Sequence, residues 1–295
     1  MEGGSREQKR CFWGLAVVEG KVPVTVLIPC FNCAASIRRT LGSVLSQTAC
    51  PTEVILIDDA SSDSTGQILR EMADAYPGWI KLLHFQRNQG VASARNAGWH
   101  CASQPYIAFL DADDVWHPRK LELQLAYMQA HPEVDLCSHR HRVLLDANAK
   151  ADWGVSRFSA SRISRWSLLW ANRFITPSVM LRRDIRQRFA EGQRYMEDRL
   201  LWLEIVCEGG RIDRLEINLA ATYKMPYGSS GLSSNLWEMT KSDVANYRQL
   251  RVEDKVSWWL GHLLELLALL KYVRRLANVA CWKVRSGQNG AGHQA

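Results

Sequence analysis

The sequence predicts an α/β fold with one mainly parallel, Rossmann-like sheet flanked by helices and a helical C-terminal extension. Short apolar runs alternate with segments of helical periodicity, which gives four β-α units within roughly 110 residues. The 295-residue chain is 47% apolar and 23% charged, so the composition excludes a disordered or fibrous protein.

The first half of the chain supplies the predicted sheet. The strands are short, apolar and rich in β-branched residues: Val24–Pro29, Glu53–Ile57, Ile80–Phe85 and Tyr106–Leu110. Helical spacing predicts helices over Ala34–Ser46 and Val91–Ala102. Capping residues predict two more, one that begins at Ser61–Asp63 and ends at Met72 and one that begins near Pro118. Ligands of such sheets bind beyond the carboxyl ends of the strands, so Pro29–Asn32, Asp58–Ser62 and Asp111–Asp114 are the candidate site segments.

The pattern changes after about Asp135. Ordered segments are predicted at Phe174–Leu181 and Tyr195–Val206, and a turn with one or two short strands at Gly209–Tyr223. A Gly/Ser-rich loop follows, and the chain is predicted to be helical from about Trp237 to Arg285. We therefore expect an N-terminal extension over 1–20, one domain over 21–225 divided at 135, and a loop with C-terminal helices over 226–295.

Charge and cysteine content limit the classes of partner. The net charge of +7 points to acidic partners such as nucleotides, phosphates, nucleic acid or anionic lipid. The basic residues are dispersed and lack a concentrated patch with aromatic readers, which argues against nucleic acid. The eight cysteines show no regular framework, and Cys30-x-x-Cys33 has no second pair, so a reduced cytoplasmic protein is expected.

Two acidic clusters follow predicted strands, Asp58-Asp59 and Asp111–Asp114. Carboxylates delivered by an apolar strand need a cation or hydrogen-bond donors to offset their desolvation. A divalent cation on a diphosphate meets that need, because Mg²⁺ and Mn²⁺ prefer carboxylate and phosphate oxygens. The alternative is that these residues cap helices and form turns.

Five blocks in the first half closely resemble the family-2 inverting glycosyltransferases, which have the GT-A fold. They run in order over Val24–Leu125, and a weaker resemblance continues to about Tyr223: Val24–Asn32, Ser43–Thr48, Val54–Thr65, Asn88–Gly98 and Tyr106–Glu122. The resemblance implies a nucleotide-binding half over 21–135 and an acceptor half over 136–225.

The same resemblance implies roles for individual residues. Pro29, Phe31 and Asn32 would contact the nucleotide base, and Asp59 or Asp58 would hydrogen-bond it. Phe31 stands where a tyrosine is common, and it keeps an aromatic face. Arg95, with Asn96, would lie beside the nucleotide pocket. Asp111 and Asp113 match the Asp-x-Asp motif, with Asp111 against the sugar nucleotide and Asp113 on the Mg²⁺ or Mn²⁺.

Glu197-Asp198 resembles the Glu-Asp motif of the same family, which makes Asp198 the catalytic base and puts Glu197 on the acceptor side. An in-line attack needs a carboxylate that takes the proton of the acceptor hydroxyl. The alternative is a pair of acids in the first turn of a helix. The implied function is transfer of a sugar from a nucleotide-diphosphosugar to a sugar or lipid-linked acceptor, in cell-surface polysaccharide or glycolipid synthesis.

Two other functions are alternatives to sugar transfer. A nucleotidyltransferase would need a Gly-rich phosphate loop after the first strand, and Pro29–Ser36 has none. A non-enzymatic nucleotide or polyanion binder on the same fold is the alternative function. His139-Arg140-His141 lies at alternate strand positions, and the pattern favours solvated side chains over a metal pair.

The C-terminal helices carry an unusual number of the twelve tryptophans. The apolar run Trp258–Leu270 would span only about 20 Å, short of a bilayer core of roughly 30 Å. Lys271, Arg274 and Arg275 follow it, and Trp282 lies beyond. This helix would pack on the catalytic domain, form a homodimer seam or lie at a membrane surface over 258–282. The last alternative places the protein at the inner face of the cell membrane.

Overall fold

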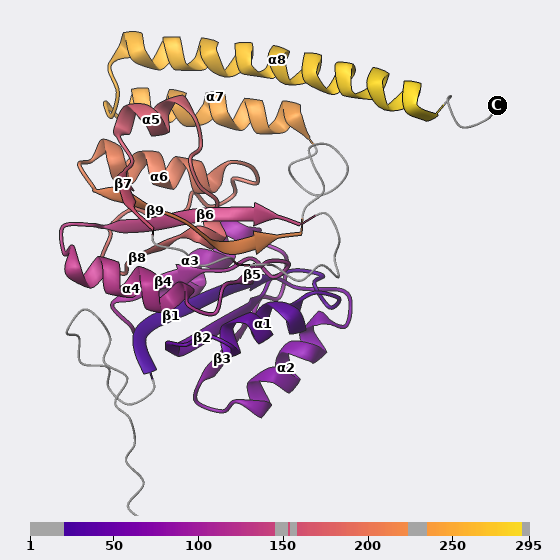
Figure 1. Ribbon diagram of the computed structural model, residues 1–295, viewed down its shortest axis with the longest axis vertical. Coiled ribbons are helices and arrows are strands. Elements are labelled where there is room, and N and C mark those ends of the chain that lie inside the picture. The colour runs from indigo at the N-terminus through magenta and orange to yellow at the C-terminus, as the bar shows by residue number, and fades with distance from the viewer. Residues whose placement is uncertain (1–20, 145–152, 154–157, 224–234, 291–295) are drawn as a thin grey trace, which may run out of the picture.

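A single nine-stranded sheet forms the centre of the structure (Figure 1). The structure is a computed structural model that describes residues 21–144, 153, 158–223 and 235–290, with side chains to residue 276. The strands are β1 (Lys21–Cys30), β2 (Cys50–Asp58), β3 (Ile80–His84), β4 (Tyr106–Phe109), β5 (Val115–Trp116), β6 (Leu136–Val143), β7 (Ala160–Arg162), β8 (Met180–Arg182) and β9 (Ile212–Thr222). Their order is β3-β2-β1-β4-β8-β6-β9-β5, and β7 pairs with β9.

The helices cover both faces of this sheet and one end of the molecule. They are α1 (Ile37–Leu45), α2 (Thr65–Ala75), α3 (Val91–Cys101), α4 (Lys120–Ala130), α5 (Arg165–Trp170), α6 (Glu197–Cys207), α7 (Leu236–Val252) and α8 (Trp258–Gly290), with a 3₁₀ turn at Thr176–Ser178. Figure 1 shows α7 and α8 stacked beyond α6, away from the sheet.

The fold class is confirmed, and the four strands predicted in the first half pair in parallel as β3-β2-β1-β4. The second half makes the sheet mixed. There β8 runs antiparallel to β4 and β6, β6 and β9 are parallel, and β5 and β7 are antiparallel to β9.

One strand of the second half differs from the sequence-based prediction. Gly209–Tyr223 holds one strand of 11 residues, β9, in place of one or two short ones. The predicted C-terminal helices are α7 and α8, and they are divided where Asp254 adopts a left-handed φ of 55° and the amides of Lys255 and Val256 bond back to Leu250 O. Asp is one of the few residue types that accept this conformation, so the break has no Gly or Pro to mark it.

Residues 1–20 and the Gly/Ser-rich loop, except Asn235, lie outside the described residues. No helix in the described part of the chain is long and apolar enough to cross a bilayer.

The core consists of two apolar clusters, one on each face of the sheet. Strand β1 contributes side chains to both clusters. Val26 and Ile28 point to the cluster under α1, α2 and α4, whereas Leu27 points to the other face. There α3 approaches the strands closely, and a Cβ at Gly98 would lie 2.9 Å from Ile57 Cδ1 and 3.1 Å from Leu27 Cδ2. This packing sets the depth of α3, which carries Arg95.

We predict that Gly98→Ala lowers the free energy of unfolding relative to wild type, because both neighbouring side chains are fully buried. Gly42→Ala is the matched control, since Gly42 is an exposed helical glycine and a Cβ added there would have nothing within 4 Å. Its helix should gain up to about 1 kcal/mol, so the two variants should differ by about 1–3 kcal/mol in urea unfolding. Equal stabilisation by both would show that α3 does not pack tightly at Gly98.

Candidate active site

The loops after β1 and β2 are tied to each other at the rim of the sheet. Asn32 has a left-handed φ of 48°; its amide donates to Ser61 Oγ at 3.0 Å, and its side-chain oxygen accepts from the Ser62 amide at 2.9 Å. Phe31 is 51% exposed beside it, and Pro29 is half-buried. The predicted base-contacting residues therefore form one rim that presents an aromatic face to solvent.

Asp58 and Asp59 are both buried and both shape that rim. Asp58 accepts from the Ser61 amide at 3.0 Å and lies 3.1 Å from His84 Nδ1. Asp59 accepts from the amides of Gln89 and Gly90, at 2.7 and 2.9 Å, just before α3. In this structure the two carboxylates organise loops. Their hydrogen bond to a base, which the resemblance implies, stays a prediction.

Arg95 on α3 joins the two acidic motifs of the sequence. Its Nη2 donates to Asp111 Oδ1 and its Nη1 to Glu197 Oε1, both at 2.8 Å. The Arg95 side chain is only 4% exposed, and its guanidinium lies 5.2 Å from the centre of the Phe189 ring. The ring packs in an aromatic cluster with Trp99, Phe109 and Trp202. One buried cation thus holds together residues that lie far apart in the sequence.

The charged groups around Arg95 shift one another's pKa values. Burial alone would lower the pKa of Arg95, but the carboxylates of Asp111 and Glu197 raise it above its ordinary value. Burial, together with the adjacent charge of Asp198, raises the pKa of Glu197 to about 7, against the opposing effect of Arg95. Glu197 is therefore a buried partner of Arg95 that carries a proton for part of the neutral pH range.

Helix α1 holds the main chain of the Asp-x-Asp segment. Thr40 Oγ1 donates to Ala112 O at 2.8 Å, and Arg39 Nη2 donates to Asp113 O at 3.0 Å. The Asp114 amide closes a turn onto Asp111 O at 3.1 Å. Asp111 and Asp113 are both half-buried after the buried strand β4. The backbone that carries these two carboxylates is therefore fixed before any ligand binds.

The donor set at this turn fits a cation that arrives with a diphosphate. Among the described residues there is no cluster of three or more His, Cys, Asp or Glu side chains able to hold a metal. Mg²⁺ at a phosphate site commonly takes one or two protein carboxylates and completes its shell with phosphate and water oxygens. Asp111 and Asp113 meet that smaller requirement.

Asp198 lies in the first turn of α6, next to the 3₁₀ turn Thr176–Ser178. Its Oδ2 accepts from Thr176 Oγ1 at 3.2 Å, and its Oδ1 accepts from the Arg199 amide at 2.7 Å. Asp198 is half-buried, whereas Glu197 beside it is buried. The chain reaches this turn through Met196, whose φ of 57° is left-handed. Of the two acids, Asp198 is the one that is partly open to solvent.

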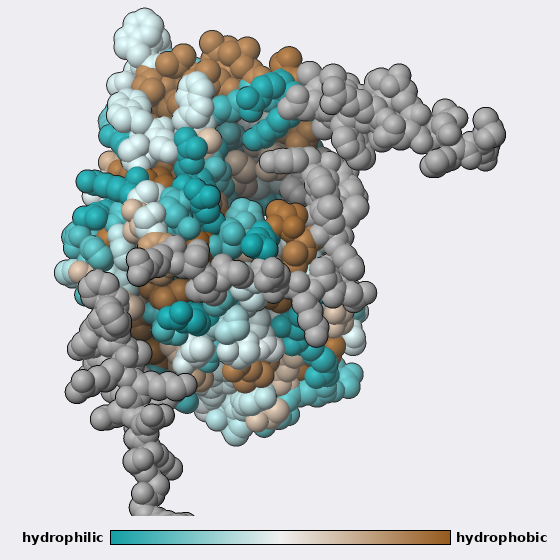
Figure 2. Space-filling view, in the orientation of Figure 1, coloured by the Kyte–Doolittle hydropathy of each residue, from teal (hydrophilic) through white to brown (hydrophobic). Residues whose placement is uncertain are grey.

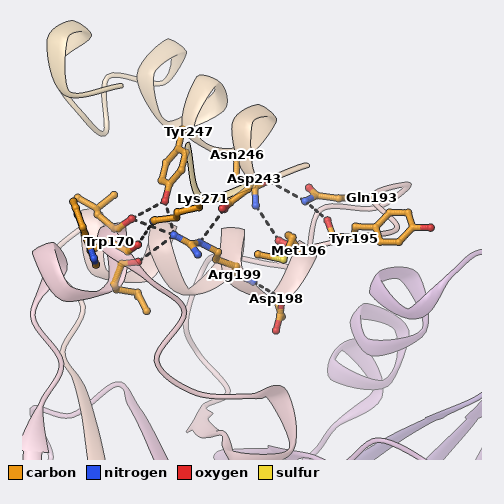
Figure 3. A network of polar contacts seen from close by, with 12 residues as sticks. Trp170, Gln193, Tyr195, Met196, Asp198, Arg199, Asp243, Asn246, Tyr247 and Lys271 are labelled. Atoms are coloured by element: carbon orange, nitrogen blue, oxygen red, sulfur yellow. Dashed lines mark hydrogen bonds and ion pairs between the residues drawn. The ribbon is translucent and has the colours of Figure 1, made fainter. Parts of the chain in front are cut away.

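A polar network behind this turn was not anticipated from the sequence (Figure 3). Arg199 contacts Asp243 at 3.1 Å and donates to Leu169 O at 3.1 Å and to the Tyr247 hydroxyl. Asn246 donates to Met196 O at 3.0 Å and accepts from Gln193 at 2.9 Å. Helix α7 therefore supports the turn that carries Glu197 and Asp198. The partners on α7 lie more than forty residues downstream, and no local sequence pattern indicates them.

The sequence also singled out Asn96 and the segment His139–His141. Asn96 binds the main chain of Phe189 through both ends of its amide, at 2.8 and 3.1 Å, and lines a shallow hollow with Gln89 and Ser93. The expectation that the His139–His141 side chains are solvated is wrong for His139, which is fully buried in β6. Burial, with the charge of Lys120, holds the pKa of His139 well below its ordinary value.

The comparisons with known proteins agree on one family. The family model "Glycosyl transferase family 2" matches residues 25–189. The Escherichia coli protein WfgD, a UDP-Glc:α-D-GlcNAc-diphosphoundecaprenol β-1,3-glucosyltransferase, is 30% identical over 74% of this chain and 82% of its own length. An uncharacterized glycosyltransferase of Nostoc is 36% identical over 43% of this chain, which spans 38% of that relative's length.

Solved structures show the same fold at low sequence identity. The mannosyltransferase PcManGT of Pyrobaculum calidifontis, in complex with GDP-Man and Mn²⁺, has a TM-score of 0.62 at 20% identity, covering 97% of this chain and 85% of that one. Staphylococcus aureus TarS, in complex with UDP-GlcNAc, has a TM-score of 0.62 at 19% identity, covering 77% and 66%.

The raised pKa of Glu197 predicts a specific pH dependence of stability. Since its folded pKa of about 7 lies above the ordinary 4.5, the stabilisation by the protonated form is fully present below pH 4.5 and is lost as the pH rises through 7. The stability of wild type minus that of Glu197→Gln should fall by about 1–3 kcal/mol between about pH 5 and 8, measured by urea unfolding. A difference that is constant or rises with pH would contradict this assignment.

Proposed function

Since the chain belongs to glycosyl transferase family 2, we propose that it moves a sugar from a nucleotide-diphosphosugar to the hydroxyl of an acceptor. The observation that carries this proposal is the position of Arg95, whose guanidinium contacts Asp111 at the end of β4 and Glu197 beside Asp198. These contacts support our assignment of Asp111 and the Glu-Asp pair to one site. In our proposal, residues 21–135 bind the donor and residues 136–225 bind the acceptor.

In the proposed reaction, Asp198 takes the proton of the acceptor hydroxyl as its oxygen attacks the anomeric carbon. The bond from that carbon to the diphosphate breaks on the opposite side, so the configuration inverts. The half-burial of Asp198 supports this role, as does its contact with Thr176, because the carboxylate is oriented yet accessible. Glu197 serves as the partner that keeps Arg95 in place.

On the donor side, Phe31 offers a ring to the nucleotide base, Asp111 lies against the sugar nucleotide, and Asp113 would hold Mg²⁺ or Mn²⁺ on the diphosphate. When bound, this metal supplies positive charge that stabilises the departing diphosphate. The fixed main chain of the Asp-x-Asp segment supports this arrangement, since it needs little reorganisation when the donor binds.

We further propose that the acceptor is a sugar carried by a lipid, and that transfer takes place at the inner face of the cell membrane in polysaccharide or glycolipid synthesis. The similarity to WfgD over most of that protein's length supports this acceptor class.

We predict that Asp198→Asn lowers turnover by a factor of about 10²–10⁴, because the general base is lost while donor binding is retained. The assay screens UDP-, GDP- and dTDP-sugars for a rise in melting temperature with Mn²⁺ and then measures transfer with the stabilising donor.

In the same assay, Asp113→Ala should abolish the dependence of the donor-induced melting shift on Mn²⁺. Asp184→Asn is the matched control, since Asp184 is exposed in a surface pair with Arg182, and it should behave as wild type. Full turnover in Asp198→Asn would remove Asp198 from its role as base, and an unchanged metal dependence in Asp113→Ala would remove Asp113 from the metal site.

A further inference from the structure

The outward side of helix α8 is mostly apolar over several turns, and His262 is the polar residue exposed within it. We define the α8 outer face as Trp259, Leu263, Leu266, Leu269, Leu270 and Val273, each of which is at least 43% exposed and of which Trp259 is 78% exposed. Figure 2 shows hydrophobic side chains gathered at this end of the molecule. Large exposed apolar surfaces on soluble proteins mark sites of contact with a partner or a membrane.

The opposite side of α8 is already occupied by the enzyme. Leu264 and Ala268 are buried in the core, and Glu265 pairs with Arg251 of α7 at 3.1 Å. A Cβ at Gly261 would lie 2.6 Å from the Arg251 side chain, so the two helices are in close contact there. The packing of α8 on the rest of the structure therefore does not cover the outer face.

Exposed tryptophans are found on α8 and also on α5, which contacts α8. Trp258 is 57% exposed on α8, and Trp166 and Trp170 of α5 are 66% and 55% exposed. Helix α5 is held beside α8 by Lys271, whose ammonium group donates to Trp170 O and lies 5.2 Å from the centre of the Trp170 ring. Tryptophan is the residue most suited to a membrane–water boundary, since its ring is apolar and its N–H needs a polar partner.

The charge pattern favours an anionic surface. Glu265 is the single acid in the sequence of α8, and it faces α7, whereas Lys271, Arg274, Arg275, Lys283 and Arg285 are basic. Arg274 is exposed at the margin of the outer face. Lys271 is turned toward Trp170 of α5, and Arg275 is half-buried. A second copy of the outer face across a two-fold axis would offer Arg274 no carboxylate, whereas an anionic lipid headgroup would pair with it.

The width of the exposed face points the same way. At 100° per residue, the exposed positions from Trp258 to Leu276 cover an arc of about 160° on the helix. A two-stranded coiled-coil seam is a narrower stripe, and a helix lying in a lipid interface buries close to half of its circumference.

We propose that α8, flanked by α5, is a membrane-docking surface that lies in the interface of a bilayer containing anionic lipids. This inference goes beyond the transfer reaction and does not depend on the donor site. Docking would hold the enzyme at the surface where a lipid-carried acceptor is found.

The test is co-sedimentation of the full chain with phosphatidylcholine vesicles, with and without phosphatidylglycerol. Wild type should bind the anionic vesicles at least tenfold more tightly than the neutral ones, and added salt should weaken binding. The double variant Leu266→Glu/Leu270→Glu should reduce binding at least tenfold, and Trp259→Ser severalfold. Leu45→Glu, at an exposed apolar position on α1, is the matched control and should bind as wild type.

Two measurements separate this proposal from its alternatives. All variants should keep the wild-type melting temperature and donor-induced shift, so a failure of sugar transfer leaves the vesicle result interpretable. Light scattering after gel filtration reports the oligomeric state. Absence of vesicle binding by wild type would overturn the proposal. If wild type were in addition a dimer that Leu266→Glu/Leu270→Glu converts to a monomer, the face would be assigned to a second copy.

Discussion

The buried guanidinium of Arg95 is the interaction on which the rest of the site depends. It places Asp111 of the first half and Glu197 of the second half within hydrogen-bond distance of one side chain. A buried cation is tolerated only when its charge is compensated, so Arg95 requires both carboxylates to be near. Its depth in turn follows from Gly98, which lets α3 lie against Leu27 and Ile57, and from the aromatic ring of Phe189 beneath it.

The second constraint is the turn that precedes α6. Met196 adopts a left-handed conformation, and its carbonyl oxygen is held by Asn246 of α7. The buried pair of Arg199 and Asp243 ties the same two helices together one turn further on. The C-terminal helices therefore belong to the same packed unit as the Glu-Asp turn. Helix α7 supports the Glu-Asp turn on one side, while α8 covers α7 and turns its apolar face outward.

Local pattern and chain direction predicted much of this arrangement. Apolar β-branched runs predicted β1 to β4, and parallel pairing then brought the acids after β4 to the same rim as the loops after β1 and β2. The hydrogen-bond partners of the acids at these strand ends were less predictable. Asp58 binds a backbone amide of its own loop, Asp59 binds two amides of the segment before α3, and Glu197, a partner of Arg95, lies 102 residues further along the chain. The break at Asp254 and the burial of His139 likewise depend on tertiary contacts and carry no local signal.

The most direct test of the central claim is the substitution Arg95→Met, with Arg38→Met in an exposed surface pair as control. We expect Arg95→Met to weaken the donor-induced melting shift and turnover together, and to lower the free energy of unfolding by about 3–5 kcal/mol, because Glu197 and Asp111 lose their shared counter-ion. Arg38→Met should leave all three quantities near wild type. An Arg95→Met protein that binds the donor and transfers sugar as wild type does would contradict the central role of this guanidinium.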